Sequence, residues 1–178
     1  GLGQSYKLPL TGIRGGFVPT KKWKKERFGT SWLVGDTLNI GIGQGFSLAT
    51  PLQLAVMTAR IASGREVTPN LIKNTEKELD KIKTLSIRKE TLAAIKKGMY
   101  DVVNDKKGTA FNFRSTDENY SIAGKTGTSQ VRKITREERE SGVIKNEDLP
   151  WKMRDHALFT CFAPYRNPKY ALSVVVEH

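Results

Sequence analysis

The side chains best suited to chemistry lie in one short segment, Gly-Lys-Thr-Gly-Thr at residues 124–128. A Gly-Lys-Thr triplet is first compared with the phosphate-binding P-loop, whose backbone N–H groups and lysine hold the phosphates of a nucleotide. That motif requires a glycine five residues before Gly124, where this chain has Asn119. It also requires a helix after the lysine, whereas β-type residues here continue to Val131. The P-loop interpretation is therefore rejected.

The same segment suits the edge of a β-strand that binds an extended peptide through main-chain hydrogen bonds. Lys125 would present a positive charge and Thr126 a hydroxyl to a substrate carboxylate. Gly127 would leave room for the substrate to approach the backbone, and the Thr128 N–H could stabilise an oxyanion, a contact worth about 3–4 kcal/mol. An ordinary strand with a bulge glycine explains these residues equally well, and the tripeptide alone does not decide between the two.

Helices and strands that would position this segment are predicted from capping signals and periodicity. Thr50-Pro51 starts a helix that runs to about Ser63 and ends at Gly64. Ser86 is expected to cap a second helix that ends at about Asn104. Short helices are predicted at 21–27 and 135–140, an extended or loop segment at 36–42, and strands at 120–130, 156–164 and 170–177.

The order of these elements predicts the fold class. Loop and helices come first, and three strands follow, which indicates an α/β (α+β) fold with helices packed on a mostly antiparallel sheet. The last two strands, with Asn167-Pro168 between them, are expected to form a hairpin. The chain stops inside its last predicted strand, so we expect it to be part of something longer.

Composition limits the other classes of function. The net charge of +12 admits a binder of nucleic acid or another polyanion, but the basic residues form separate groups and are not interleaved with aromatic residues. A solvated basic surface is the preferred interpretation, with no nucleic-acid partner. Cys161 is the only cysteine, which excludes an internal disulfide and a cysteine-rich metal site. No apolar run is long enough to span a bilayer, and we expect any export signal or membrane anchor of the parent to lie outside these residues.

Motifs spread over the whole chain resemble the penicillin-binding protein 2 type of class B penicillin-binding proteins. The segment at 124–128 matches the Lys-Thr-Gly motif of the wider serine β-lactamase and penicillin-binding superfamily. Before it come Gly-Ile-Gly-Gln-Gly at 41–45 and a Thr-Pro-Leu-Gln helix start at 50–53. Further matches lie at Pro19-Thr20, Trp23, Arg27-Phe28, Trp32, 35–37, 98–100, 102–104, Gly108-Thr109-Ala110, 129–131, Arg154-Asp155-His156-Ala157 and 162–164.

This resemblance implies the C-terminal part of one transpeptidase domain, covering residues 1–178, in an elongation-type peptidoglycan D,D-transpeptidase. Such an enzyme cross-links stem peptides through an acyl-serine intermediate, needs no cofactor or metal, and is trapped by β-lactam antibiotics. The parent would be anchored in the cytoplasmic membrane with this domain on the periplasmic side, and would work beside a membrane glycan polymerase. The resemblance assigns catalysis to Lys125, Thr126 and Gly127, and substrate binding to Lys125, Thr126 and Thr128.

Two of the three motifs of this superfamily are not found where the resemblance requires them. Ser86-Ile87-Arg88-Lys89 matches Ser-x-x-Lys, but it follows the Gly-Ile-Gly-Gln-Gly block that this motif should precede. Ser115-Thr116-Asp117 matches the second motif but lies only ten residues before Lys125. We reject both, expect the nucleophile to lie upstream of this chain, and predict that the chain alone cannot acylate.

Other polar residues are assigned structural roles. His156, beside Asp155, is interpreted as a strand residue with a structural hydrogen bond, although its type permits proton transfer. Cys161 is expected to pack in the core, and Gln44 to hold its loop. A β-lactamase or D,D-carboxypeptidase shares Lys-Thr-Gly and stays an alternative, against which the Gly-Ile-Gly-Gln-Gly block and the long connection at 131–155 argue.

Overall fold

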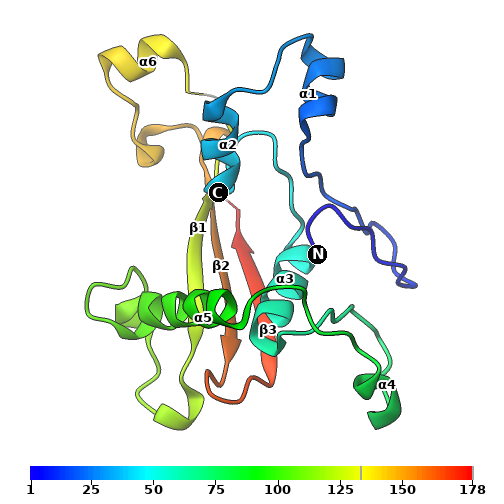
Figure 1. Ribbon diagram of the computed structural model, residues 1–178. Coiled ribbons are helices and arrows are strands. Elements are labelled where there is room, and N and C mark those ends of the chain that lie inside the picture. Colours follow the sequence, from blue (N-terminus) through cyan, green and yellow to red (C-terminus); the bar gives the residue numbers. More distant parts are fainter. Residues whose placement is uncertain (133, 178) are drawn as a thin grey trace.

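A three-stranded antiparallel sheet forms the centre of the protein (Figure 1). The computed structural model describes residues 1–132 and 134–177. The strands are β1 (Ala123–Ser129), β2 (His156–Ala163) and β3 (Tyr170–Val176), in the order β1-β2-β3. The fold class and all three predicted strands are confirmed. The last strand ends at Val176, one residue before its predicted end at Glu177, and His178 lies outside the described residues.

Two long helices lie against this sheet, and shorter ones lie around it (Figure 1). α3 contacts β2 and β3, whereas α5 crosses β1. The helices are α1 (Lys21–Phe28), α2 (Val34–Gly41), α3 (Pro51–Ser63), α4 (Glu76–Asp80), α5 (Lys89–Asn104) and α6 (Arg136–Ser141). In Figure 1, α2 and α6 lie near one end of the strands, and α5 runs across them.

Local signals define α3 at both ends. The Thr50 side chain accepts a hydrogen bond from the Gln53 N–H, and the Gln53 side chain accepts one from the Thr50 N–H. Gly64 ends the helix in the left-handed conformation. Gln53 is fully buried, and its side-chain amide also donates to the carbonyls of Gln4 and Gly15. One side chain thus caps α3 and fastens the N-terminal segment to it.

The core cluster lies on the face of the sheet where α3 and α5 meet it. Ala62 of α3 and Met99 of α5 pack against Ala123 and Phe162 on the neighbouring strands β1 and β2. Both Ala123 and Phe162 are completely buried. Because alternate residues of a strand point to opposite faces, Lys125 lies on the same face as Ala123, further along β1. The core therefore fixes the start of the strand that carries the Lys-Thr-Gly motif.

The loop prediction for residues 36–42 is wrong, because α2 occupies most of this segment. The Asp36 carboxylate accepts a hydrogen bond from the Leu33 N–H at 2.7 Å and forms an ion pair with Lys24 of α1. The hydrogen bond from Lys24, together with that from Leu33, holds the pKa of Asp36 below its usual value. A side chain distant in sequence therefore stabilises the first turn of a helix that has no Ser, Thr or Asn cap.

The predicted start of the second long helix is also wrong. α5 begins at Lys89 after Arg88, with no side-chain cap, and Ser86 lies in the preceding bend. Thr84 forms an isolated bridge with Arg65, and the Leu85 N–H donates to the Gly64 carbonyl. These contacts hold the chain extended up to Leu85, so the helix can begin only after the bend.

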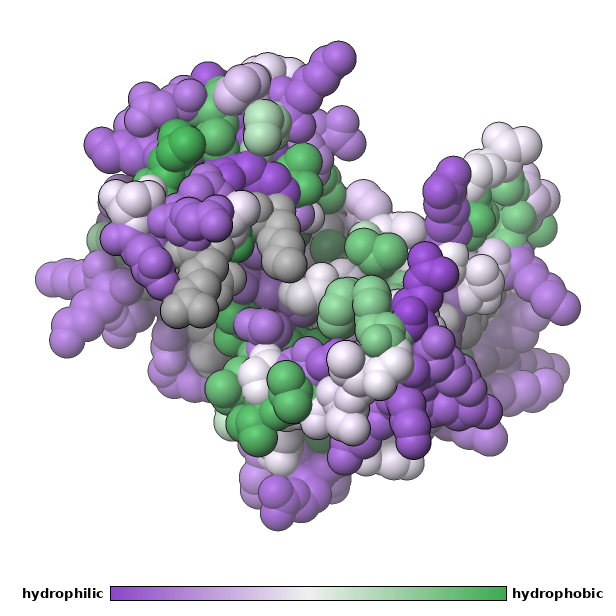
Figure 2. Space-filling view, turned by 90° about the horizontal axis from the view of Figure 1, so that it is seen from above, coloured by the Kyte–Doolittle hydropathy of each residue, from purple (hydrophilic) through white to green (hydrophobic). Residues whose placement is uncertain are grey.

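The space-filling view shows hydrophobic patches among hydrophilic residues on the surface seen from above (Figure 2). Several of the most exposed apolar side chains lie on or beside α2, among them Val34, Leu38 and Ile42. They occur at four-residue spacing, so they share one side of this helix. In the described part of the chain, no helix has both the length and the apolar character needed to cross a membrane.

Candidate active site

β1 lies at the edge of the sheet with the Lys-Thr-Gly motif in its middle. Its inner edge pairs with β2 in a regular register, in which Lys125 lies opposite Thr160 and Gly127 opposite Leu158. Among residues 1–132 and 134–177, no strand pairs with the outer edge of β1. The outer backbone groups of an edge strand can bind an extended peptide. This placement fits the edge-strand interpretation of the motif.

Lys125 is exposed, on the face of the sheet that carries the core. Its Nζ donates to the Thr126 carbonyl at 2.7 Å and lies 3.5 Å from the Thr126 Oγ1. Across the strand pair, the Thr160 hydroxyl contacts that of the buried Thr58 in α3 and lies 3.1 Å from the Leu172 carbonyl. A chain of hydroxyls therefore joins α3 to the sheet beside the lysine.

Thr126 points to the opposite face of the strand and is half-buried. Its Oγ1 lies 3.1 Å from the Oγ1 of Thr109, either of which can be the donor. The two threonines border a pocket of about 280 Å³ whose other walls are apolar, formed by Val103, Ala110, Phe113, Ile122 and Phe159. The hydroxyl pair is the polar part of a mainly apolar pocket behind the motif.

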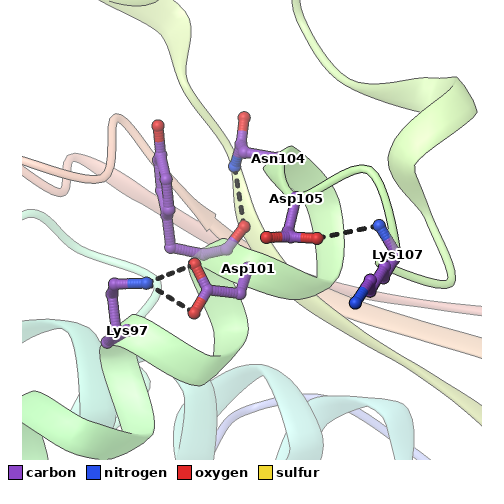
Figure 3. Close-up of polar contacts among 6 residues, drawn as sticks. Lys97, Asp101, Asn104, Asp105 and Lys107 are labelled. Atoms are coloured by element: carbon purple, nitrogen blue, oxygen red, sulfur yellow. Dashed lines mark hydrogen bonds and ion pairs between the residues drawn. The ribbon is translucent and has the colours of Figure 1, made fainter.

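Thr109 reaches Thr126 because of the way in which the chain leaves α5. The Asn104 side chain donates to the carbonyls of Tyr100 and Ile122, which joins the end of α5 to the residue before β1. The Asp105 carboxylate then accepts the Lys107 N–H at 2.8 Å, which turns the chain back towards the helix. Figure 3 shows the contacts of Asn104 within α5 and of Asp105 with Lys107, together with the Lys97–Asp101 pair one turn earlier.

The turn after α5 requires a glycine. A Cβ on Gly108 would lie 2.3 Å from the Val102 carbonyl oxygen and 2.4 Å from that of Asp101, which no side chain tolerates. Two residues later, the N–H of the buried Ala110 donates to the same Val102 carbonyl at 3.0 Å. Thr109 is therefore held between two residues that are fixed against α5.

The two glycines of β1 have different surroundings. A Cβ on Gly124 would lie 2.6 Å from the Phe159 ring and 3.0 Å from the Cys161 Cβ, so the strand pair packs against bare backbone here. A Cβ on Gly127 would meet only Leu158, at 3.4 Å, an ordinary contact. Packing therefore explains Gly124 but not Gly127. Thr128 is exposed, opposite Ala157.

The connection between β1 and β2 is anchored at its two ends. The Asp155 carboxylate accepts the Val131 N–H at 3.1 Å, and the Arg154 side chain donates to the Leu149 carbonyl at 2.8 Å. Arg154-Asp155 thus ties the ends of the connection together. His156 starts β2 opposite Ser129. Cys161 is buried as predicted, and its burial raises the pKa of the thiol.

The two serines that were rejected as catalytic residues lie in a turn and in a bend. The Ser115 hydroxyl donates to the Asp117 carbonyl and accepts the Asp117 N–H, a closed turn. Ser86 lies in the bend before α5. Thr109 was not predicted as a site residue, although its Gly-Thr-Ala triplet was among the motifs that carry the resemblance. Within the described ranges, no cluster of His, Cys, Asp or Glu could hold a metal ion.

Comparisons with known proteins agree along the whole chain. All of residues 1–178 match the penicillin binding protein transpeptidase domain family. Peptidoglycan D,D-transpeptidase MrdA of Haemophilus influenzae is 38% identical over 90% of this chain and 25% of its own length. MrdA of Escherichia coli K12 is 33% identical over 100% of this chain and 29% of its own length. The chain thus spans less than a third of the length of these curated relatives.

Solved structures agree with the sequence relatives. The penicillin-binding protein PBP2 of Helicobacter pylori, in its complex with MreC, has a TM-score of 0.80 and 38% identity, covering 100% of this chain and 30% of that one. Pseudomonas aeruginosa PBP2, in complex with WCK 5153, has a TM-score of 0.72 and 33% identity, covering 99% of this chain and 37% of that one. The chain therefore belongs to the penicillin-binding protein transpeptidase domain family, and the four relatives named above are of the PBP2 (MrdA) type.

Proposed function

We propose that this chain is the C-terminal part of a serine-type peptidoglycan D,D-transpeptidase and supplies its substrate-binding strand. One observation supports this most strongly, namely that the Lys-Thr-Gly motif lies on an edge strand whose outer edge is unpaired in the described part of the chain. The relatives that match the whole chain are named peptidoglycan D,D-transpeptidases. The parent protein, of which these residues are one part, would perform the reaction.

In the proposed reaction, a serine outside this chain attacks the carbonyl between the last two D-alanines of a stem peptide. Its proton passes through a base to the departing D-alanine amine, and the acyl group stays on the serine oxygen. An amine of a second stem peptide then attacks this ester, the serine oxygen takes back a proton, and the new peptide bond is the cross-link. A β-lactam acylates the same serine, as the substrate does in the first step, and stays attached to it.

The residues of β1 would bind and stabilise the reacting groups. Lys125 and Thr126 would hold the terminal carboxylate, since a charged or hydroxyl donor forms a strong hydrogen bond with an anion. The Thr128 N–H would stabilise the negative oxygen of the tetrahedral intermediate. Gly127 would leave the space through which the peptide reaches the strand. Substrate access would therefore explain a glycine at this position, which packing does not explain.

The remaining assignments concern the parent protein. We propose that residues 1–178 form the C-terminal part of one domain, with the nucleophile in the part that precedes it. Anchoring in the cytoplasmic membrane, exposure to the periplasm and work beside a membrane glycan polymerase belong to the same proposal. Its substrates would be peptidoglycan stem peptides, its inhibitors β-lactams, and its chemistry would need no cofactor.

Labelling with a fluorescent penicillin tests the proposed function. The full-length parent is expected to be labelled, and the chain of residues 1–178 is not. Labelling of the short chain that is lost in Ser86→Ala would show that Ser86 is the nucleophile and would contradict the proposal. Absence of labelling in the folded parent would also contradict it. Product analysis with a stem peptide separates a transpeptidase from a carboxypeptidase or β-lactamase, which would release only hydrolysed product.

A further inference from the structure

Two groups that can donate a proton lie beside the Thr126 hydroxyl. Thr109 Oγ1 lies 3.1 Å from Thr126 Oγ1, and Lys125 Nζ, which can only donate, lies 3.5 Å away. A threonine hydroxyl has one proton to donate and two lone pairs to accept with. If Thr109 donates its proton to Thr126, the lone pairs of Thr126 are used and its own proton remains for a third group. If Thr126 donates to Thr109 instead, its proton is not available to a ligand.

The position of Thr109 does not depend on Thr126. Gly108 packs against the carbonyls at the end of α5, and the buried Ala110 donates to one of them. Thr109 itself is exposed, so solvent or a ligand can reach the hydroxyl pair. A donor held by a rigid backbone is already oriented before the ligand arrives, and no ordering is required when it binds.

We infer that Thr109 is a positioning residue that donates its hydroxyl proton to Thr126 and thereby directs the Thr126 proton to the carboxylate of the bound substrate or β-lactam. A bound anion accepts and cannot donate, so it selects this orientation of the pair. Each hydrogen bond in such a chain strengthens the next. The inference rests on the proposed function, because it takes the carboxylate role of Thr126 from there.

The experiment compares a penicillin that has a free carboxylate with its methyl ester. In the full-length parent, the second-order acylation rate constant is measured for both compounds, and their ratio reports recognition of the carboxylate. Thr109→Val removes the hydroxyl but keeps the branched shape, and should lower the ratio by about 3- to 10-fold, the effect of one hydrogen bond. Thr109→Ser keeps the hydroxyl and should restore the ratio. Thr109→Ala replaces Thr109→Val if the latter does not fold.

Thr126→Val separates this inference from the proposed function. It should lower the ratio, and adding Thr109→Val to it should have no further effect, because the two residues act through one proton. If Thr126→Val lowers the ratio and Thr109→Val does not, the inference about Thr109 is wrong and the role of Thr126 stands. Equal losses for acid and ester in Thr109→Val would likewise show a purely structural residue. An unchanged ratio in Thr126→Val would instead contradict the carboxylate role on which both depend.

Discussion

The two outer strands of the sheet, β1 and β3, differ in composition although both flank β2. β1 consists of alanine, glycine, lysine, threonine and serine, and its large side chains are few. β3 contains three valines and a leucine, with alternating burial along its length. On β3, Val175 faces α3 and is half-buried, whereas Val174 on the other face is 48% exposed.

We interpret β3 as a strand that packs, and β1, under the proposed function, as a strand that contacts a ligand. β-Branched residues on β3 fit a pleated, half-buried surface and stabilise the sheet. The glycines and small polar residues of β1 provide little such packing, so the position of this strand depends on its contacts with β2 and α5. Four experiments test this comparison.

Replacement of the lysine on β1 should have the largest effect. In the full-length parent, Lys125→Ala should slow acylation by β-lactams about 100-fold, because the ligand carboxylate loses a charge-assisted hydrogen bond. Lys169, exposed in the turn between β2 and β3, is the matched control, and Lys169→Ala should change the rate less than about twofold. Near-normal acylation in Lys125→Ala would refute the role assigned to β1.

The two glycines of β1 should respond differently to alanine. Gly124→Ala should lower the free energy of unfolding by about 1–3 kcal/mol, because its Cβ overlaps the Phe159 ring. Gly127→Ala should change stability by less than about 0.5 kcal/mol and yet slow acylation about tenfold, since the methyl group obstructs the ligand. Chemical denaturation and acylation kinetics measure both variants. A stable, fully active Gly127→Ala would remove the functional reason for this glycine.

The two faces of β3 should differ in their tolerance of a hydroxyl. Val175→Thr should destabilise the protein by about 1–2 kcal/mol, because a hydroxyl is placed at the interface with α3. Val174→Thr should change stability by less than about 0.5 kcal/mol, since its side chain is about half exposed. Denaturant titration of the parent measures both. Equal losses would show that another part of the parent covers the outer face of β3.

The thiol of the middle strand reports on the contact between β1 and β2, with the smallest expected effect. Burial raises the pKa of Cys161, so less thiolate is present at a given pH and alkylation should be slower than for a free thiol. Gly124→Ala, whose Cβ would press on Cys161, should increase its labelling by iodoacetamide at pH 8. Mass spectrometry of the Cys161 peptide measures the labelling, and equal rates in both proteins would contradict close packing at this contact.

The sequence predicts those elements whose signals are local. The capping residues of α3 and the aromatic and β-branched residues of β2 and β3 lie within the elements that they define, and these predictions are confirmed. α2 was missed because the partner of Asp36 is Lys24, on another helix. The start of α5 was misplaced because an isolated bridge to Arg65 holds the chain extended before it. Contacts between distant residues decided both cases.

The same distinction applies to the candidate site. The motif Lys125-Thr126-Gly127 was identified from its residue types, whereas the position of its strand at the edge of the sheet is known only from the structure. The pairing of Thr126 with Thr109 could not be predicted, because the residues between them form turns with no repeating pattern. Gly108 carried a signal, but only the approach of its backbone to α5 shows what that glycine does.

The hydroxyl contact between Thr58 and Thr160 joins α3 to the middle of the sheet. Because Thr160 also bonds to the Leu172 carbonyl, one side chain links a helix and two strands. Regions joined in this way open together, so the backbone amides of α3, β2 and β3 should exchange with deuterium as one slow unit. Lys125 lies on β1, at the border of that unit. We expect the amides of β1 to be protected from exchange by their pairing with β2 rather than by packing of the β1 side chains.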